Sequence, residues 1–170
     1  MGRALLARGV GLVYGGGSVG LMGVLANAVL AGGGEVIGVL PRGLARKEYA
    51  HPGLTELRLV GSMHERKALM ASLADGFVAL PGGLGTLEEI LEVFTWAQLG
   101  IHQKPVGLVD VDGYWAGLLA LLEHAVQEGF IRPEYAGLLL VEPDPDALLD
   151  RFAAWRPPVM PPVWLDATET

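Results

Sequence analysis

The 170-residue chain contains no cysteine, which excludes disulfide bridges, cysteine-ligated zinc, iron–sulfur clusters and thiol nucleophiles. Basic residues are also few: 12 lysines and arginines stand against 19 acidic residues, a net charge of −7. Binding to nucleic acid without sequence preference needs a basic face, so no nucleic acid partner is expected. The chain has no apolar run of about 18 residues and no signal peptide, so we expect no membrane span and a cytoplasmic location.

The chain alternates short apolar segments with helical ones, and 25 of its residues are glycine. Strand segments that are apolar throughout are typical of a parallel sheet covered by helices on both faces. The expected strands are 10–14, 36–40, 56–60, 77–80, 105–109 and 138–141. The expected helices are 2–8, 21–30 (buried, because it is apolar nearly all round), 62–73, 87–99, 114–127 and 145–155. This pattern predicts an α/β fold, a Rossmann-like three-layer α/β/α domain with a mainly parallel sheet.

The expected boundaries are one domain over residues 1–155 and a proline-rich tail over 156–170. The tail has no hydrophobic period, so we expect an extended arm or disorder there. Doubly wound domains usually open with a strand, whereas this chain opens on a helical segment. We therefore expect that a strand before residue 1 is missing.

The first glycine segment, Gly15 to Gly20, has the pattern G-x-G-x-x-G between an expected strand and an expected helix. Glycines let the backbone approach an anion, and the helix N-terminus adds partial positive charge. The dinucleotide pattern also needs an acid at the end of the next strand, but Pro41 and Arg42 follow that strand. A phosphate or nucleotide loop is therefore favoured over NAD binding, Arg42 keeps NADP open, and a purely structural turn is the other alternative.

The second glycine segment, Pro81 to Thr86, again lies between an expected strand and an expected helix. Its N–H groups and the Thr86 hydroxyl are suited to hold a phosphate, but no lysine follows Gly85 as in a Walker loop. Glu88 and Glu89 are expected in the first helical turn, where acids complement the helix dipole. Because two carboxylates lie beside an anion loop, we expect one of them to face the cleft and do chemistry.

A third segment, Ser62 to Lys67, begins a helix in which Ser62 and Glu65 form a capping box. Arg66 and Lys67 are adjacent, and from composition alone a solvated face is the simpler interpretation. The four histidines (His51, His64, His102 and His124) have no metal-ligand spacing, so no metal is assigned.

Four segments together resemble the LONELY GUY (LOG) family, once labelled lysine decarboxylase. They are 82–89, which follows Pro81 as P-G-G-x-G-T-x-x-E, and 63–67, 15–23 and 95–102. The resemblance runs from about Gly9 to Phe152 and departs at the start, where the family's first strand and its glycine–serine turn are not found.

The resemblance implies a Rossmann-like homodimer that cleaves the N-glycosidic bond of a nucleoside 5′-monophosphate, such as a cytokinin riboside monophosphate or AMP. The implied reaction requires no metal or organic cofactor. It implies that Arg66 and Glu89 are the catalytic pair: Glu89 stabilises the oxocarbenium-like charge and orients water, and Arg66 orders Glu89 and holds ribose or phosphate. The expected substrate-binding residues are Gly15, Gly16, Gly17, Ser18, Glu48, Lys67, Gly82, Gly83, Leu84, Gly85, Thr86, Leu87, Glu88 and Thr95.

Three other functions are compatible with parts of the pattern. A non-catalytic nucleotide or molybdenum-cofactor carrier would need the glycine segments but not the pair Arg66 and Glu89. An NAD(P) oxidoreductase lacks its ribose-binding acid. A pyridoxal-dependent decarboxylase needs a Schiff-base lysine, and Lys47, Lys67 and Lys104 lie in no setting recognisable for it.

Overall fold

The structure is a computed structural model in which residues 1–45 and 50–158 are described. The chain divides into two compact units, Met1–Ala74 and Asp75–Thr170, and each is described by itself.

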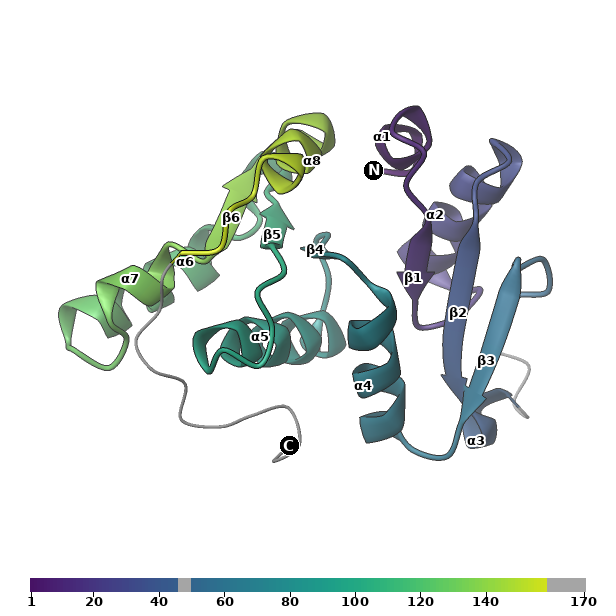
Figure 1. Cartoon of the computed structure of the whole chain (residues 1–170), viewed down its shortest axis with the longest axis horizontal. Coiled ribbons are helices and arrows are strands. Elements are labelled where there is room, and N and C mark those ends of the chain that lie inside the picture. Colours follow the sequence, from purple (N-terminus) through teal and green to yellow (C-terminus); the bar gives the residue numbers. More distant parts are fainter. Residues whose placement is uncertain (46–49, 159–170) are drawn as a thin grey trace. The chain divides into compact units, whose positions relative to one another are not determined.

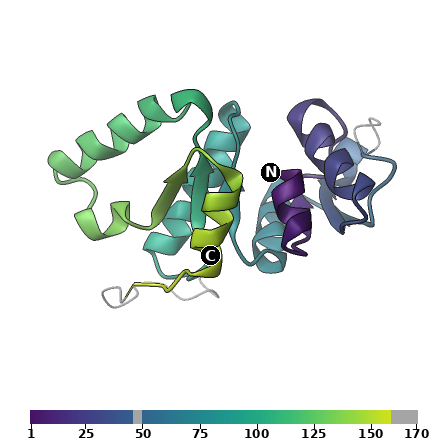
Figure 2. The ribbon, with the colours of Figure 1, turned by 90° about the horizontal axis from the view of Figure 1, so that it is seen from above.

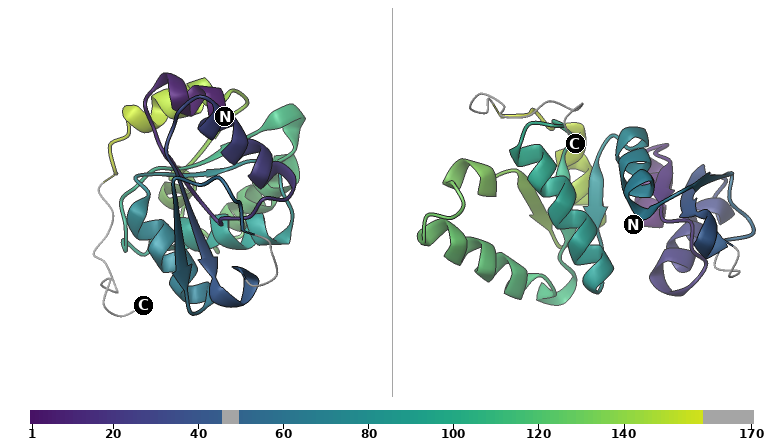
Figure 3. Two further views of the ribbon diagram at one scale, coloured as in Figure 1. Left: turned by 90° about the vertical axis from the view of Figure 1, so that its right-hand side faces the viewer. Right: turned by 90° about the horizontal axis from the view of Figure 1, so that it is seen from below.

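The first unit is a three-stranded parallel sheet with helices on both faces. Its elements are α1 (Gly2–Ala7), β1 (Leu12–Tyr14), α2 (Gly20–Ala31), β2 (Val36–Pro41), α3 (Arg42–Ala45), β3 (Glu56–Val60) and α4 (Met63–Leu73). The strand order is β1-β2-β3, with Tyr14 beside Gly38 and Gly38 beside Leu57. Helices α1 and α2 lie on one face of this sheet and α4 on the other (Figure 3).

Helix α2 corrects one expectation, because it is not buried. Only Gly23, Ala26 and Val29 are buried, and their spacing of three residues makes one stripe that faces the sheet. The side chains of Leu21 and Val24 are 60% and 64% exposed. A helix in the outer layer of a sheet buries a single stripe, so apolar residues all round it leave the remainder on the surface of the single chain.

The second unit is also a three-stranded parallel sheet, in the order β4-β5-β6 (Figure 1). Its elements are β4 (Phe77–Ala79), α5 (Leu84–Gln98), β5 (Val106–Val109), the 3₁₀ turn η1 (Val111–Gly113), α6 (Ala116–Gln127), α7 (Pro133–Ala136), β6 (Leu139–Glu142) and α8 (Pro145–Ala153). The main core packs Ile90 and Phe94 of α5 against Leu108 of β5 and the fully buried Trp115. This core fixes the positions of the carboxyl ends of β4 and β5, from which the loops to α5 and α6 begin.

The other face of this sheet is covered by α8, which lies along it in the view from above (Figure 2). Gly107 of β5 has no side chain because Leu148 and Phe152 of α8 occupy the space where a Cβ would stand. Asp144 caps α8 as expected, since its carboxylate accepts a hydrogen bond of 3.2 Å from the Ala147 N–H.

The expected fold class is confirmed: every pair of described strands is parallel, helices flank both sheets, and the arrangement is an open Rossmann-like α/β one. Two helix starts differ from expectation by more than one residue. Helix α6 begins at Ala116, because Trp115 is its N-cap and donates its backbone N–H to Asp110 Oδ1 at 2.8 Å. Helix α5 begins three residues early, at Leu84.

The single domain over 1–155 stays a prediction, and residues 159–170 of the expected tail lie outside the described residues. Among the described strands, β1 pairs with β2 alone and β4 with β5 alone. No helix in the part of the chain that the structure describes is long and apolar enough to cross a membrane.

Candidate functional site

The first glycine loop joins β1 to α2, and the buried side chain of Tyr14 supports it. Gly15, Gly16 and Gly17 are buried, and Gly16 has a φ of +73°, which favours glycine. The hydroxyl of the buried Tyr14 donates a hydrogen bond of 3.0 Å to the Gly17 carbonyl. Burial raises the pKa of Tyr14 to about 12, so this hydroxyl stays protonated and remains a donor.

His51 fastens the same loop from the other side. Its backbone N–H donates to the Gly16 carbonyl at 2.9 Å. Its ring is buried and accepts from the Gly53 N–H at Nδ1, so Nε2 carries the proton and donates to Asn27 Oδ1 on α2 at 3.0 Å. Sequence analysis assigned no role to Tyr14 or His51; the only signal is that Tyr14 immediately precedes the glycines.

The loop continues into the N-terminus of α2. Its N-cap residue, Val19, makes no side-chain hydrogen bond to the first turn, so no side chain of the cap competes with an anion there. Gly23 lies directly under the loop, because a Cβ on it would come within 2.6 Å of the Ser18 carbonyl carbon. Ser18 itself is exposed at the rim.

Helix α4 brings Arg66 to this loop, although the two are about 50 residues apart in sequence. The capping box is confirmed in part: Ser62 Oγ accepts from the Glu65 N–H at 3.1 Å, while the Glu65 carboxylate accepts from the Gly61 N–H at 2.8 Å. Arg66 is half-buried, and a Cβ on Gly15 would overlap its Nη2 and lie 3.0 Å from Cζ. Gly15 therefore makes the room that the Arg66 guanidinium occupies.

The second glycine loop joins β4 to α5. Gly83 is the N-cap of α5 and makes no side-chain cap, and Leu84 and Gly85 are exposed in the first turn. Thr86 completes that turn with its side chain folded back over Gly82, where a Cβ would lie 2.9 Å from Thr86 Cβ. The first N–H groups of a helix have no partner inside the helix, so those at this helix start and the Thr86 hydroxyl form a second site suited to an anion.

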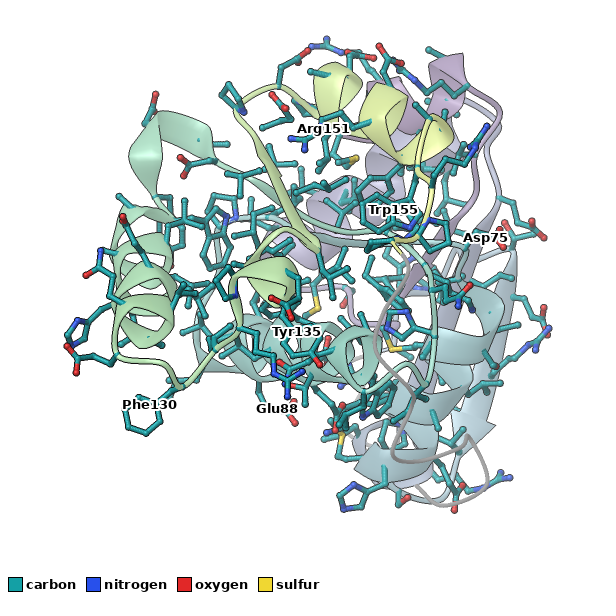
Figure 4. All side chains as sticks on the ribbon, turned by 60° about the vertical axis from the view of Figure 1, so that its left-hand side comes forward. Asp75, Glu88, Phe130, Tyr135, Arg151 and Trp155 are labelled. Carbon is teal, nitrogen blue, oxygen red and sulfur yellow. The ribbon has the colours of Figure 1, made fainter. Side chains whose placement is uncertain are left out.

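Glu88 and Glu89 do not lie in the first turn of α5, which corrects a second expectation. Because α5 begins at Leu84, both glutamates fall in the second turn, beyond the strong influence of the helix dipole. Dipole complementation is therefore a poor explanation for them. Glu88 is exposed on α5 (Figure 4) and Glu89 is half-buried.

The structure brings the expected residues together in two groups, one in each unit. In the first unit Gly15 to Ser18 form one loop, and Gly15 lies against Arg66 of α4; in the second unit Gly82 to Glu89 form one continuous loop and helix start. Thr95 is not part of the second group: it lies nine residues after Thr86 on α5, about 14 Å along the axis. Glu48 lies outside the described residues.

Tyr114 is a contact to the second loop that sequence analysis missed. Its hydroxyl donates a hydrogen bond of 2.6 Å to the Gly82 carbonyl. The signal available in the sequence is topological: Tyr114 follows β5, and the carboxyl ends of adjacent parallel strands lie at one edge of a sheet.

The second unit also contains a hollow that lies apart from these groups. A hollow of about 280 Å³ between α5, α6, α7 and β6 is lined by apolar side chains and Glu123, and by none of the expected site residues. Among the described residues no cluster of three or more histidine, aspartate or glutamate side chains is placed to hold a metal ion.

His102 belongs to one of the segments that carry the family resemblance, and both of its ring nitrogens make hydrogen bonds to the backbone. Its Nε2 donates to the Val93 carbonyl at 2.8 Å and its Nδ1 accepts from the Lys104 N–H, so the ring is neutral. Burial lowers the pKa of His102; the Val93 bond opposes this, and the charge of Lys104 lowers it further.

We therefore expect stability to depend on His102 below neutral pH. Between its lowered native pKa and the ordinary value near 6.5, the unfolded chain binds more protons, so the free energy of unfolding falls as pH falls through that window. Urea unfolding at several pH values between 7 and 5 should show a smaller pH slope for His102→Gln than for the wild type. His124→Gln, at an exposed position of α6, is the control; an unchanged slope in His102→Gln contradicts the prediction.

The chain is similar in sequence to one known protein family and to several curated proteins. Residues 22–152 match a family model described as "Possible lysine decarboxylase". Two curated relatives in Oryza sativa subsp. japonica are named "Probable cytokinin riboside 5'-monophosphate phosphoribohydrolase": LOGL5 is 54% identical over 93% of this chain and 64% of its own length, and LOGL9 is 56% identical over 92% and 69%. "Cytokinin riboside 5'-monophosphate phosphoribohydrolase LOG3" of Arabidopsis thaliana is 50% identical over 92% and 73%. The chain thus spans about two thirds of the length of the relatives that it matches.

Among solved structures, the molybdenum cofactor binding protein from the phototrophic bacterium Rippkaea orientalis is similar with a TM-score of 0.65 and 21% identity. The alignment covers 90% of this chain and 82% of that chain. At this level of identity the likeness shows the fold alone.

Proposed function

The chain belongs to the family described as possible lysine decarboxylases, the LOG family, and from this membership we propose that it is a nucleoside 5′-monophosphate phosphoribohydrolase. The reaction splits the N-glycosidic bond with water and gives a free base and ribose 5-phosphate. Identity of 50–56% to relatives named for this activity is the observation that carries the proposal. Neither lysine of the described residues, Lys67 or Lys104, lines the hollow in the second unit, which speaks against the decarboxylation in the family's description.

We propose that Glu89 is the catalytic carboxylate. N-glycosidic cleavage builds positive charge on the ribose ring, and a carboxylate beside the anomeric carbon stabilises that charge and orients the attacking water. A half-buried carboxylate is suited to this because its field is less screened than that of an exposed one. Glu88, exposed one residue earlier, is proposed as a substrate contact.

Arg66 is proposed as the cation that holds the ribose or phosphate. A guanidinium offers five donors in a planar fork, which match phosphate and vicinal hydroxyl oxygens. Its position beside the first glycine loop supports this role, because Gly15 to Ser18 are themselves proposed to bind substrate. Lys67, Glu48 and Thr95 are proposed as further substrate contacts.

The 5′-phosphate is proposed to bind at the second glycine loop, through N–H groups at the start of α5 and the Thr86 hydroxyl. Binding energy from this remote group helps to position the reacting bond and so contributes to the rate. No metal or organic cofactor enters the proposed reaction.

A homodimer in the cytoplasm completes the proposal. The exposed apolar residues of α2 support a second copy as partner, because a row of large apolar side chains on a surface is typical of an interface. Light scattering coupled to size exclusion measures the mass directly, and a mass near 18.0 kDa would exclude the dimer.

Incubation of the purified chain with AMP or a cytokinin riboside monophosphate, followed by chromatography for free base and ribose 5-phosphate, tests the activity. We expect equal amounts of the two products. Tight nucleotide binding by a folded protein without release of base would instead favour a carrier.

A further inference from the structure

We propose that Tyr114 is a positioning residue that holds the second glycine loop in the conformation that receives the substrate's phosphate; this inference rests on the function proposed above. The Tyr114 hydroxyl donates to the Gly82 carbonyl oxygen at 2.6 Å, across 32 residues of sequence. Neither residue type nor spacing in the glycine motif requires this contact.

The contact acts on the loop through the geometry of one peptide. The carbonyl of Gly82 and the N–H of Gly83 belong to the same planar trans peptide and point in opposite directions. Holding the carbonyl on Tyr114 therefore turns the Gly83 N–H, at the N-cap of α5, to the opposite side. Two consecutive glycines have many other conformations available, so a tether here removes much of their freedom.

A second contact restricts the same peptide. The side chain of Thr86 lies where a Cβ on Gly82 would stand, so Gly82 is packed against the first turn of α5 on one side and tied to Tyr114 on the other. The peptide that presents the Gly83 N–H is thus held before any ligand arrives. Such preorganisation lowers the entropic cost of binding.

Tyr114 is itself held by a rigid neighbour. Trp115 is 2% exposed, its Nε1 donates to the Val109 carbonyl at 3.1 Å, and its backbone N–H donates to Asp110 Oδ1 at 2.8 Å. The Tyr114 ring stands edge-on to this indole, with centroids 5.0 Å apart and planes at 87°. The buried tryptophan therefore fixes where the tyrosine hydroxyl can reach.

The backbone before Tyr114 is strained, which supports a functional role. Asp112 has a φ of +52°, the sole positive φ of a non-glycine residue among the described residues, and Gly113 follows at +73°. A strained turn persists where the surrounding structure over-determines it, and such turns gather at functional sites. Here the turn directs the exposed tyrosine toward the glycine loop instead of into a regular helix.

The test uses Tyr114→Phe, which keeps the ring on Trp115 and removes only the hydroxyl. Calorimetric titration with ribose 5-phosphate should show a Kd about fivefold higher than in the wild type, the size of one neutral hydrogen bond. For AMP hydrolysis we expect KM to rise by a similar factor while kcat changes less than twofold, because Glu89 is untouched. Tyr135→Phe, on α7 of the same unit (Figure 4), should leave both values unchanged.

Amide hydrogen exchange without ligand separates a positioning role from general stability. In Tyr114→Phe, a peptide covering residues 80–87 should exchange faster, while peptides from β5 and α8 keep their wild-type rates. An unchanged Kd and unchanged exchange in 80–87 would overturn the inference, and so would uniformly faster exchange, which indicates a structural role.

These readouts also distinguish this inference from the function on which it rests. If the wild type binds ribose 5-phosphate but does not hydrolyse AMP, the proposed activity fails while the effect of Tyr114→Phe on binding and exchange still supports the tether. If AMP is hydrolysed and Tyr114→Phe has wild-type KM and Kd, the activity stands and the tether is wrong. A wild type that does not bind ribose 5-phosphate overturns the phosphate loop and the tether together.

Discussion

Replacement of Glu89 by glutamine is expected to lower kcat for AMP hydrolysis by about a hundredfold or more, the scale on which positioned acid–base groups contribute. Glutamine has nearly the same shape and keeps an oxygen acceptor, but it carries no negative charge to stabilise the developing charge on the ribose. Glu89 is only half-buried and lies in a regular turn of α5, so the substitution should leave the fold intact. Initial rates of adenine release at saturating AMP measure the effect.

Glu123→Gln is the matched control, since it makes the same chemical change at an exposed position of α6 in the same unit. It should retain wild-type kcat and KM. If Glu89→Gln also retains a near-wild-type rate, Glu89 is not the catalytic carboxylate. A parallel loss of ribose 5-phosphate binding would indicate a binding role instead of a role in the chemical step.

Gly15→Ala is expected to reduce kcat/KM by roughly a hundredfold through Arg66. The new methyl group would overlap Arg66 Nη2 and lie 3.0 Å from Cζ, so the guanidinium must move away from the first glycine loop. A displacement of about 1 Å from the productive geometry can lower the rate by about a hundredfold. The end of a flexible side chain can move cheaply, so the free energy of unfolding should change little compared with the loss of activity.

Gly43→Ala, at a position of α3 with open space around the added methyl group, is the control and should keep full activity. Steady-state kinetics and urea unfolding of the two variants compare the two effects. Loss of activity in proportion to loss of folded protein would show that Gly15 is needed for the fold and not for the placement of Arg66. Wild-type activity in Gly15→Ala would remove Arg66 from the proposed site.

The parallel α/β architecture and the location of both glycine loops could be predicted from the sequence alone. The apolar strand segments, the glycines that follow them and the caps Ser62 and Asp144 are local signals, and each acts within a few residues of chain. The family resemblance could also be recognised from the sequence, because its motifs are continuous segments such as 82–89.

Which side chains support those loops depends on how the elements pack in three dimensions. Arg66 beside Gly15 and Tyr114 on Gly82 join residues that lie 51 and 32 positions apart, and strand order brings them together. The exposure of α2 was likewise invisible to a pattern, since an apolar helix buries only the stripe that a neighbouring sheet covers. Hydrogen-bonded caps and turns involve near neighbours and can be predicted from residue types, whereas contacts across the fold depend on how distant elements pack, which no local pattern encodes.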